Sequence, residues 1–375
     1  MKLLLKNTLT RNKDLFEPRK KDQVKLFTCG PSVYNLPHIG NYRTYLFEDV
    51  LERTLEALGY RVNRMINFTD IEDKALSEAG SRGLKNLSQL TKPNEEQFLK
   101  DAQTLGIRLP DKIPRSSTSV DQAAGLIKLL LEKGNAYWHQ GDVFFDPLTF
   151  KGFGRLYGLD MSRWPSRKVR FRKDTYPGQR WNLGDFILWN GKRQGDAFVW
   201  ESEIGPGRPA WNIQDPAMIS QELGFELDIC CGGVDNLYRH HDYNIAVMES
   251  LSGTTLAPFW LHGEHLMVEG AKMSKSKGNI VYPADLFKKG WTPGFLRFFL
   301  LSAHYRSVLD LSTESIEKAG SRFNRLRNLV MGFQEDNNPQ TKPALHSLFL
   351  VLKLCLTGHL FTWQTIWTYL LQSVL

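Results

Sequence analysis

The order of apolar and polar residues in the first part of the chain predicts a sheet covered by helices. Residues 24–30 form an apolar run that ends at Gly30-Pro31, which is typical of a buried strand. Apolar positions then recur at helical spacing from 41 to 58, and residues 61–68 form the next apolar run. A strand, a helix and a strand within about 45 residues predict a βαβ unit, with a parallel sheet and a right-handed crossover.

The pattern changes near residue 134. Helical stretches at 92–107 and 119–133 give way to short aromatic strands among Gly and Pro residues, from about 134 to 209. The strands expected there include 142–146 and 155–159, and we interpret the whole stretch as an inserted α+β subdomain. The segments predicted after it are strands at 223–230 and 258–268 and helical stretches at 240–252 and 283–334.

The composition is that of an ordinary folded protein. At roughly 100–200 residues per domain, the 375 residues give a prior of two to three domains. Hydrophobic residues make up 42% of the chain and charged residues 23%, which excludes global disorder. The net charge of +8 permits a polyanionic partner such as RNA but does not require one.

Cysteine usage and the N-terminal residues favour a cytoplasmic protein. Four cysteines are too few for a disulfide scaffold, and two of them are adjacent. The first residues contain no long apolar region and no small-residue cleavage site, so we expect no secretory signal. They are poor in Arg and include Asp14 and Glu17, which argues against an organellar transit peptide. The cysteines are Cys29, Cys230, Cys231 and Cys355.

The loop after the first predicted strand contains His38-Ile39-Gly40-Asn41. Parallel α/β sheets place ligands at the carboxyl ends of their strands, near helix N-termini. A histidine there can reach a phosphate, and Gly40 lets a flat ring approach the backbone closely. Alone, the tetrapeptide is a weak signal, and a polar helix N-terminus without a ligand is its plainer interpretation.

A second motif lies about 230 residues later, in a predicted loop after a strand. Lys272-Met273-Ser274-Lys275-Ser276 is followed by Lys277-Gly278-Asn279, so three lysines fall within six residues. Lysines so spaced suit a mobile loop over a polyphosphate, where they neutralise charge that develops on leaving pyrophosphate. A solvated basic loop is the plainer interpretation of such a run, but the order and spacing of the two motifs favour the functional one.

Together the motifs resemble HIGH and KMSKS, the two signatures of class I aminoacyl-tRNA synthetases. More narrowly, the sequence is similar to the cysteinyl-tRNA synthetase family, over about residues 1–340. The stretches that carry the resemblance are TCGPSVYNLPHIGNYRT (28–44), INFTDIEDKA (66–75), GDVFFD (141–146), GPGRPAWNI (205–213), CGGVDNLYRHH (231–241) and AKMSKSKGN (271–279).

The resemblance implies an α/β fold of several domains. It predicts a Rossmann-type parallel sheet split by an inserted α+β subdomain, then a KMSKS-bearing domain and a partial helical bundle. The implied ranges are 1–133 and 210–268 for the two halves of the Rossmann catalytic domain, 134–209 for the insertion, 269–312 for the KMSKS domain and 313–375 for the bundle.

The resemblance also implies a two-step reaction, in which ATP and an amino acid give an aminoacyl-adenylate whose acyl group passes to tRNA. His38 and Asn41 would contact the phosphates of ATP, carried with Mg²⁺, and Asn41 replaces the second histidine of the motif. Lys275, assisted by Lys272, would bind ATP in the pyrophosphate-releasing transition state. The other implied nucleotide contacts are Gly40, Ser274, Ser276 and Asp235, the last holding the ribose, and the implied amino-acid pocket comprises Cys29, Tyr34, Thr69, Trp211 and Cys230.

The family selects cysteine with a zinc ion, because a soft thiolate binds zinc far better than the hydroxyl of serine. Two of the four ligand positions implied by the resemblance, Cys29 and His240, hold the expected residue types. Asp215 stands at the position of the second cysteine, and Asn244 at that of a glutamate. Such a set would give a weaker, harder site, and Cys230 or Cys231 could instead supply a thiolate. Equally, Cys29 could be a small buried apolar residue and His240 a hydrogen-bonded polar one.

Two segments, residues 344–375 and 167–173, each have two interpretations. Residues 344–375 carry Lys353 as their only charged side chain, and a membrane-spanning helix is a weak interpretation because Lys353, Gly358 and His359 interrupt it. We expect instead a frameshift near 350–360 and no anticodon-binding domain. The basic run 167–173 could contact the acceptor end of tRNA, or be a solvated strand edge.

The leading hypothesis is a monomeric, cytoplasmic, ATP-dependent cysteine–tRNA ligase whose partners are tRNA(Cys), ATP and cysteine, with no membrane. A paralogous adenylate-forming ligase with another amino acid or a non-tRNA acceptor is the second. A weakly active RNA-binding paralogue is the third. Asp215 and Asn244 weigh against the zinc of the first hypothesis.

Overall fold

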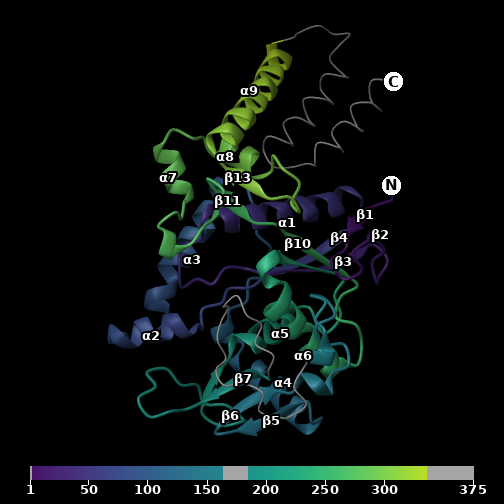
Figure 1. Cartoon of the computed structure of the whole chain (residues 1–375), viewed down its shortest axis with the longest axis vertical. Helices are drawn as coiled ribbons and strands as arrows, with labels where there is room; N and C mark the ends of the chain where they lie inside the picture. Colours follow the sequence, from purple (N-terminus) through teal and green to yellow (C-terminus); the bar gives the residue numbers. More distant parts are fainter. Residues whose placement is uncertain (1, 164–184, 336–375) are drawn as a thin grey trace. The chain divides into compact units, whose positions relative to one another are not determined.

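A computed structural model describes residues 2–163 and 185–335 (Figure 1). The basic run 167–173 and the segment 344–375 lie outside the described residues. The chain divides into two compact units. Unit 1 comprises Met1–Leu36, Asn63–Glu95 and Pro110–His262, and unit 2 comprises Pro37–Val62, Glu96–Leu109 and Gly263–Leu375.

A four-stranded sheet with a parallel central pair carries unit 1. Its strands lie in the order β10 (Phe259–Gly263), β9 (Ile229–Gly233), β3 (Gln23–Thr28) and β4 (Arg61–Ile66). In the parallel pair, Leu26 of β3 lies opposite Ile229 of β9, and Thr28 opposite Cys231. The strands predicted at 24–30 and 61–68 and the parallel α/β fold are therefore confirmed.

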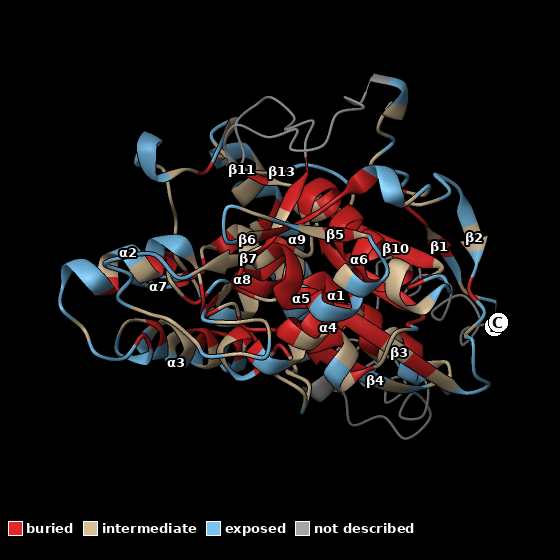
Figure 2. Cartoon of the chain, turned by 90° about the horizontal axis from the view of Figure 1, so that it is seen from below, coloured by how far each residue is buried: buried red, intermediate tan, exposed pale blue. Residues whose placement is uncertain are grey.

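Three helices of unit 1, α4 (Val120–Glu132), α5 (Trp211–Glu222) and α6 (Tyr243–Ser252), pack against one another. Figure 2 shows that buried residues concentrate in them, whereas the peripheral α2 (Asp73–Ser81) is mostly exposed. The helical pattern at 240–252 begins earlier than predicted, with a π-helical turn over Leu237–Asp242 that leads directly into α6.

The inserted segment of unit 1 forms an antiparallel sheet of β5 (Ala136–His139), β6 (Asp142–Phe145), β7 (Phe186–Gly191) and β8 (Gly207–Pro209). It packs on α4 and α5. The Phe186 ring stacks on Tyr243 of α6 at 3.9 Å between centroids and on Phe145 at 4.8 Å. Burial of each Phe side chain contributes about 1.5–3 kcal/mol, so this stack is a main anchor of the insertion.

The strand predicted at 155–159 is wrong, because this segment is a turn. Gly154 and Gly158 both have positive φ, and the Gly158 N–H donates to the Gly154 carbonyl at 2.8 Å. The buried carboxylate of Asp242 accepts hydrogen bonds from the backbone N–H groups of Leu156, at 3.0 Å, and Tyr157, at 2.9 Å. A side chain distant in sequence therefore satisfies the donors that a partner strand would otherwise take.

The boundaries of two other predicted strands also need correction. At 223–230 the chain turns through Gly224, with φ +84°, and the strand begins only at Ile229. Residues 258–268 form two strands in different sheets, β10 and β11 (Leu266–Val268), instead of one.

Unit 2 is built on the long helix α1 (Ile39–Ala57) and a small sheet of β12 (Ala271–Lys272), β11 and β13 (Leu309–Leu311). Asp49 of α1 forms a buried ion pair of 2.7 Å with Arg297 of α8 (Pro293–Leu300). The predicted helical stretch 283–334 contains α7 (Pro283–Lys288), α8 and α9 (Thr313–Glu335), but strand β13 interrupts it.

The remaining elements complete the described chain. A short hairpin of β1 (Leu4–Lys6) and β2 (Lys13–Leu15), which the pattern does not predict, precedes β3. Helix α3 (Ser88–Thr104) confirms the helix predicted near 92–107. A search of the described residues finds no helix with the length and apolar character that crossing a membrane requires.

Candidate functional site

The candidate site has two parts, one within each unit. Unit 2 contains both signature motifs, and unit 1 contains the residues expected to recognise the amino-acid side chain.

The first motif forms the N-terminus of α1 in unit 2. His38 is the N-cap residue, with an extended backbone, and its N–H donates to Asn41 Oδ1 at 2.9 Å. Asn41, which occupies the position of the second histidine of the motif, therefore helps to cap the N-terminus of the helix. The dipole of a helix N-terminus favours a nearby anion, and the phosphate contact of His38 and Asn41 stays a prediction.

The second motif touches the first at Gly40. A Cβ on Gly40 would lie 2.9 Å from Cε of Met273 and 3.1 Å from Cε1 of His38. Met273 is buried, and the N–H of Ile39 donates to the carbonyl of Val281, just beyond the lysine loop, at 3.0 Å. The structure thus brings together two motifs that are about 230 residues apart in the sequence.

Asn279 shapes the lysine loop, defined as residues 272–279. Its Oδ1 accepts from the Ser274 N–H at 2.9 Å, and its Nδ2 donates to the Lys272 carbonyl at 3.2 Å. A 3₁₀ turn over Lys275–Lys277 follows, and Gly278 ends it with φ +64°. The side chains of the three lysines are exposed, whereas Met273 between them is buried. The loop therefore presents its ammonium groups to solvent while the methionine holds it on unit 2.

Arg43 is an anchor of this region that the sequence reasoning missed. Its buried guanidinium donates to four backbone carbonyls, which flank β11 and β13. The acceptors are Glu264 and His265, both at 2.8 Å, His304 at 3.1 Å and Ser307 at 2.5 Å. Burial lowers the pKa of Arg43 to about 10. Because β11 pairs with β12, where the lysine loop starts, Arg43 ties the loop to α1.

In unit 1, Cys29 follows β3 at the carboxyl end of the sheet. Its N–H donates to the Cys231 carbonyl at 3.1 Å, and its Sγ lies 3.5 Å from Nδ2 of Asn236. Cys230 is buried on the neighbouring β9. Burial, together with the nearby charge of Asp215, raises the pKa of the Cys230 thiol well above its ordinary value, which disfavours a thiolate there.

Asp215 is a buried carboxylate on α5, held between two side-chain amides. Asn67 donates from Nδ2 to Oδ1 at 3.0 Å, and Asn244 donates from Nδ2 to Oδ2 at 3.3 Å. Burial raises the pKa of Asp215 to about 6, against the opposing effect of the Asn244 hydrogen bond. Asn67 also accepts from the Gly30 N–H at 2.8 Å, so it connects the end of β3 to α5. The sequence reasoning did not single out Asn67, although it lies in the stretch 66–75.

Trp211 begins α5, one turn before Asp215, and its ring lies 4.5 Å from that of His240 between centroids. Burial lowers the pKa of His240 to about 4, opposed by the nearby charge of Asp235. The Nδ2 of Asn67 lies 3.4 Å from Oγ1 of Thr69, so Asn67 connects Thr69 to Asp215. The hydroxyl of Tyr34, by contrast, donates to Glu78 of α2 at 2.6 Å.

Asp235 is exposed in the turn after β9. Gly233, just before it, donates its N–H to Asn236 Oδ1 at 2.9 Å. A Cβ on Gly233 would lie 2.5 Å from Oδ1 of Asp235, so a side chain at this position would displace the exposed carboxylate. The glycine turn places the Asp235 carboxylate at the carboxyl end of a sheet strand, where a ribose is expected to bind.

The residues at the implied zinc positions do not fit a zinc site. Among the described residues, no group of three or more His, Cys, Asp and Glu side chains is arranged to hold a metal ion. Both oxygens of Asp215 accept amide hydrogen bonds, and Asn244 directs a donor, not an acceptor, toward that carboxylate.

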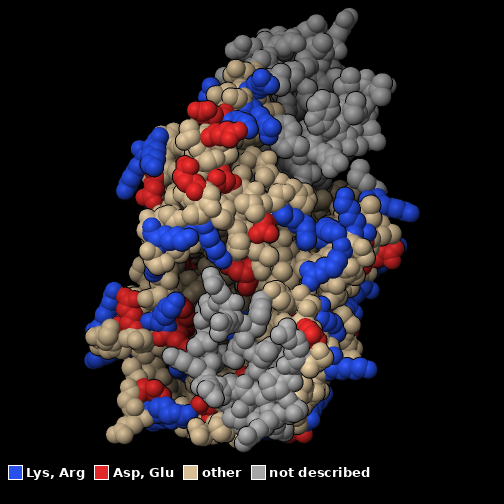
Figure 3. Space-filling model, in the orientation of Figure 1, with Lys and Arg blue, Asp and Glu red and all other residues tan. Residues whose placement is uncertain are grey.

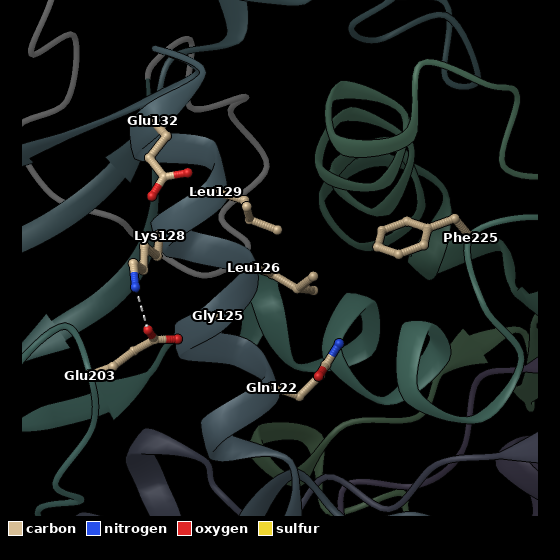
Figure 4. A pocket seen from close by; sticks show the side chains of 8 residues that line it. All are labelled: Gln122, Gly125, Leu126, Lys128, Leu129, Glu132, Glu203 and Phe225. Atoms are coloured by element: carbon tan, nitrogen blue, oxygen red, sulfur yellow. Dashed lines mark hydrogen bonds and ion pairs between the residues drawn. The ribbon is translucent and has the colours of Figure 1, made fainter.

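A groove of about 440 Å³ lies elsewhere in unit 1, on one side of α4 (Figure 4). Leu126, Leu129 and Phe225 line it, with the Lys128–Glu203 ion pair of 2.8 Å at its rim. The groove contains none of the predicted site residues. On the face drawn in Figure 3, Lys and Arg side chains lie in separate groups interspersed with Asp and Glu.

Comparisons with known proteins agree with this geometry. The family model of the class I (C) tRNA synthetase catalytic domain matches residues 15–321. The cysteine–tRNA ligase of Brachyspira hyodysenteriae is 37% identical over 350 residues, which cover 93% of this chain and 73% of that protein. The cysteine–tRNA ligase of Chlamydia pneumoniae is 39% identical over 346 residues, which cover 91% and 72% of the two chains.

A solved structure of Mycobacterium tuberculosis methionyl-tRNA synthetase in complex with methionyl-adenylate has a TM-score of 0.66 to this chain. The match has 15% identity and covers 94% of this chain and 81% of that one, so it supports the fold alone. The family predicted from the two motifs is confirmed by the sequence comparisons. The chain belongs to the cysteine–tRNA ligase family of class I aminoacyl-tRNA synthetases.

Proposed function

We propose that this protein activates cysteine with ATP and transfers the cysteinyl group to tRNA(Cys). In the first step, a carboxylate oxygen of the amino acid attacks the α-phosphorus of ATP, and pyrophosphate leaves. In the second, a ribose hydroxyl of the tRNA attacks the acyl carbon, and AMP leaves. The observation that carries the proposal is the contact between the two signature motifs at Gly40 and Met273.

The residues of unit 2 act by position and charge. The N-terminus of α1, with His38 and Asn41, presents the positive end of the helix dipole to the phosphates. Lys272 and Lys275, both exposed on the lysine loop, would neutralise charge as pyrophosphate forms. Ser274 and Ser276 supply further donors from the same loop. Mg²⁺, carried in with ATP, would neutralise further phosphate charge.

The residues of unit 1 bind the amino acid and the ribose. Trp211, Thr69, Cys29 and Cys230 lie with Asp215 around the ends of β3, β9 and α5 and form the proposed amino-acid pocket. Asp235 is proposed to hold the ribose. Tyr34 remains a candidate for the pocket, although its hydroxyl binds Glu78.

The test is ATP–pyrophosphate exchange with a panel of amino acids, followed by charging of tRNA(Cys) transcripts. Exchange that depends on cysteine, together with acid-precipitable cysteinyl-tRNA, is the expected result. Absence of exchange with every amino acid would overturn the proposal and favour an RNA-binding paralogue.

A second candidate function is an adenylate-forming ligase for a different amino acid or a non-tRNA acceptor. The buried Asp215, at the position where the family has a cysteine, favours it. Exchange driven only by another amino acid, or exchange with cysteine that never leads to tRNA charging, would support this alternative. The monomeric state and the cytoplasmic location stay predictions.

A further inference from the structure

We infer that the amino-acid pocket of this protein works without a metal ion and recognises the substrate side chain by a hydrogen bond to Asp215. The substrate class is a small amino acid with a terminal thiol or hydroxyl donor. The inference rests on the proposed function, because it assumes that an amino acid is activated in this pocket.

The hydrogen bonds of Asp215 give the first reason. A zinc ligand must direct a lone pair at the metal, with a Zn–O distance of about 2.0–2.2 Å. Here both carboxylate oxygens are already oriented by amides, one by Asn67 from the end of β4 and one by Asn244 from α6. The neighbours that orient Asp215 are therefore neutral amides, and among the described residues no group of three or more His, Cys, Asp and Glu side chains gathers with it to hold a metal ion.

Asn244 gives the second reason. A neutral amide is a poor ligand for zinc, and its oxygen is the atom that would have to bind. The structure turns its Nδ2 toward Asp215 instead, so Asn244 acts as a donor that supports the carboxylate. Asp215 and Asn244, the two residues that differ from the family's ligands, are therefore hydrogen-bond partners, with Asn244 as donor and Asp215 as acceptor.

The surroundings of the cysteines give the third reason. Cys29 Sγ faces the amide donor of Asn236 at 3.5 Å, and Cys230 is buried beside β3. A zinc site also needs three or four such side chains converging on one point. Within the described ranges, no such convergence of His, Cys, Asp and Glu exists.

Asp215 remains able to accept a further hydrogen bond. A carboxylate has about four lone-pair positions, of which the two asparagines occupy two. Trp211 lies one turn before Asp215, so the two side chains project from the same side of α5. A short side chain that ends in S–H or O–H suits this arrangement, because it donates to the carboxylate while its methylene packs on the ring.

This mode of recognition changes specificity. Zinc separates cysteine from serine by preferring a soft thiolate, whereas a carboxylate accepts from a hydroxyl at least as well as from a thiol. We therefore expect the ratio of kcat/KM for cysteine over serine to stay within about 100-fold, the scale of discrimination by shape alone.

The decisive readout is the metal content of the protein. Elemental analysis of the purified full chain is expected to find no stoichiometric zinc, and calorimetric titration with zinc should show no site. The matched variant Asp215→Cys/Asn244→Glu restores the family ligand types and is expected to bind one zinc. Stoichiometric zinc in the unaltered protein would overturn the inference, whether or not the protein is active.

The second readout is specificity in pyrophosphate exchange. The double variant should raise the cysteine-to-serine ratio at least tenfold over the unaltered protein. Asp215→Ala should raise KM for cysteine and for serine about tenfold, with the thermal unfolding midpoint as the control for folding. An unchanged KM for both amino acids would overturn the role of the carboxylate. Failure of the proposed function would differ, since no amino acid would then drive exchange.

Discussion

The two parts of the site differ in how far they follow the pattern of the family. In unit 2, the HIGH-type and KMSKS motifs lie in contact, and Arg43 and Asn279 hold the lysine loop that carries the second motif. In unit 1, the Asp215 carboxylate accepts hydrogen bonds from two asparagine amides, at a position where the resemblance to the family implies a cysteine thiolate. The part proposed to bind ATP keeps the two family motifs, whereas the part proposed to bind the amino-acid side chain departs from the family at Asp215 and Asn244. If these roles are right, recognition of the amino acid can change while the residues for adenylate formation stay in place.

The largest effect is expected at Lys275 in the lysine loop. Lys275→Ala removes a charge aimed at the leaving pyrophosphate and should lower the exchange rate about 100- to 1,000-fold. Lys277→Ala, two residues further on and equally exposed, is the matched control and should change the rate little. Equal losses in both variants would show that only the overall charge of the loop matters.

The next largest effect concerns the anchor of that loop. Arg43→Gln removes the donor from part-buried backbone carbonyls, each at a cost of about 1 kcal/mol, so the free energy of unfolding should fall by about 3 kcal/mol. Chemical denaturation measures this change. Arg61→Gln, at an exposed position of β4, should shift it by less than about 0.5 kcal/mol. A similar small shift for Arg43→Gln would contradict the role assigned to Arg43.

The contact between the motifs predicts a moderate effect. Gly40→Ala pushes a methyl group against Met273 and should raise KM for ATP about tenfold, because displacements of about 1 Å at a site are costly. Since Met273 Cε is the nearest atom, Gly40→Ala/Met273→Ala should recover part of the loss. If the second substitution restores nothing, the contact is not the cause.

The smallest expected effect is a change in the free energy of unfolding with pH, caused by Asp242 of unit 1. Burial raises the pKa of Asp242 to about 7. The backbone hydrogen bonds from Leu156 and Tyr157 and the nearby charge of Arg155 oppose this rise. The folded protein therefore binds this proton more tightly than the unfolded chain, so acidification stabilises the fold. Between pH 8 and pH 6 the free energy of unfolding should rise by about 1.4 kcal/mol from this group. Asp242→Asn should remove that rise, and an unchanged pH slope would refute the assignment.

Local patterns predicted the regular elements well, because β3, α1 and β4 each carry their own periodicity. They failed where distant residues decide. The turn at 155–159 depends on the Asp242 carboxylate, and the strand at 258–268 divides at Gly263, whose Cβ would lie 3.2 Å from the ring of Phe47.

The same distinction applies to the site. Motifs contiguous in sequence identified His38, Gly40 and Lys275, but the contact between Gly40 and Met273 is visible only in three dimensions. The sequence showed that Asp215 and Asn244 depart from the family. It could not show that the two residues bond to each other, or that Asn67 completes the network, because these contacts join separate elements.

We propose that this protein combines the ATP-binding motifs of unit 2 with an amino-acid pocket in unit 1 that needs no metal. Cysteine-dependent ATP–pyrophosphate exchange in the presence of a zinc chelator tests it most directly. We expect exchange to proceed at the same rate with and without the chelator. Exchange that the chelator abolishes and added zinc restores would contradict it.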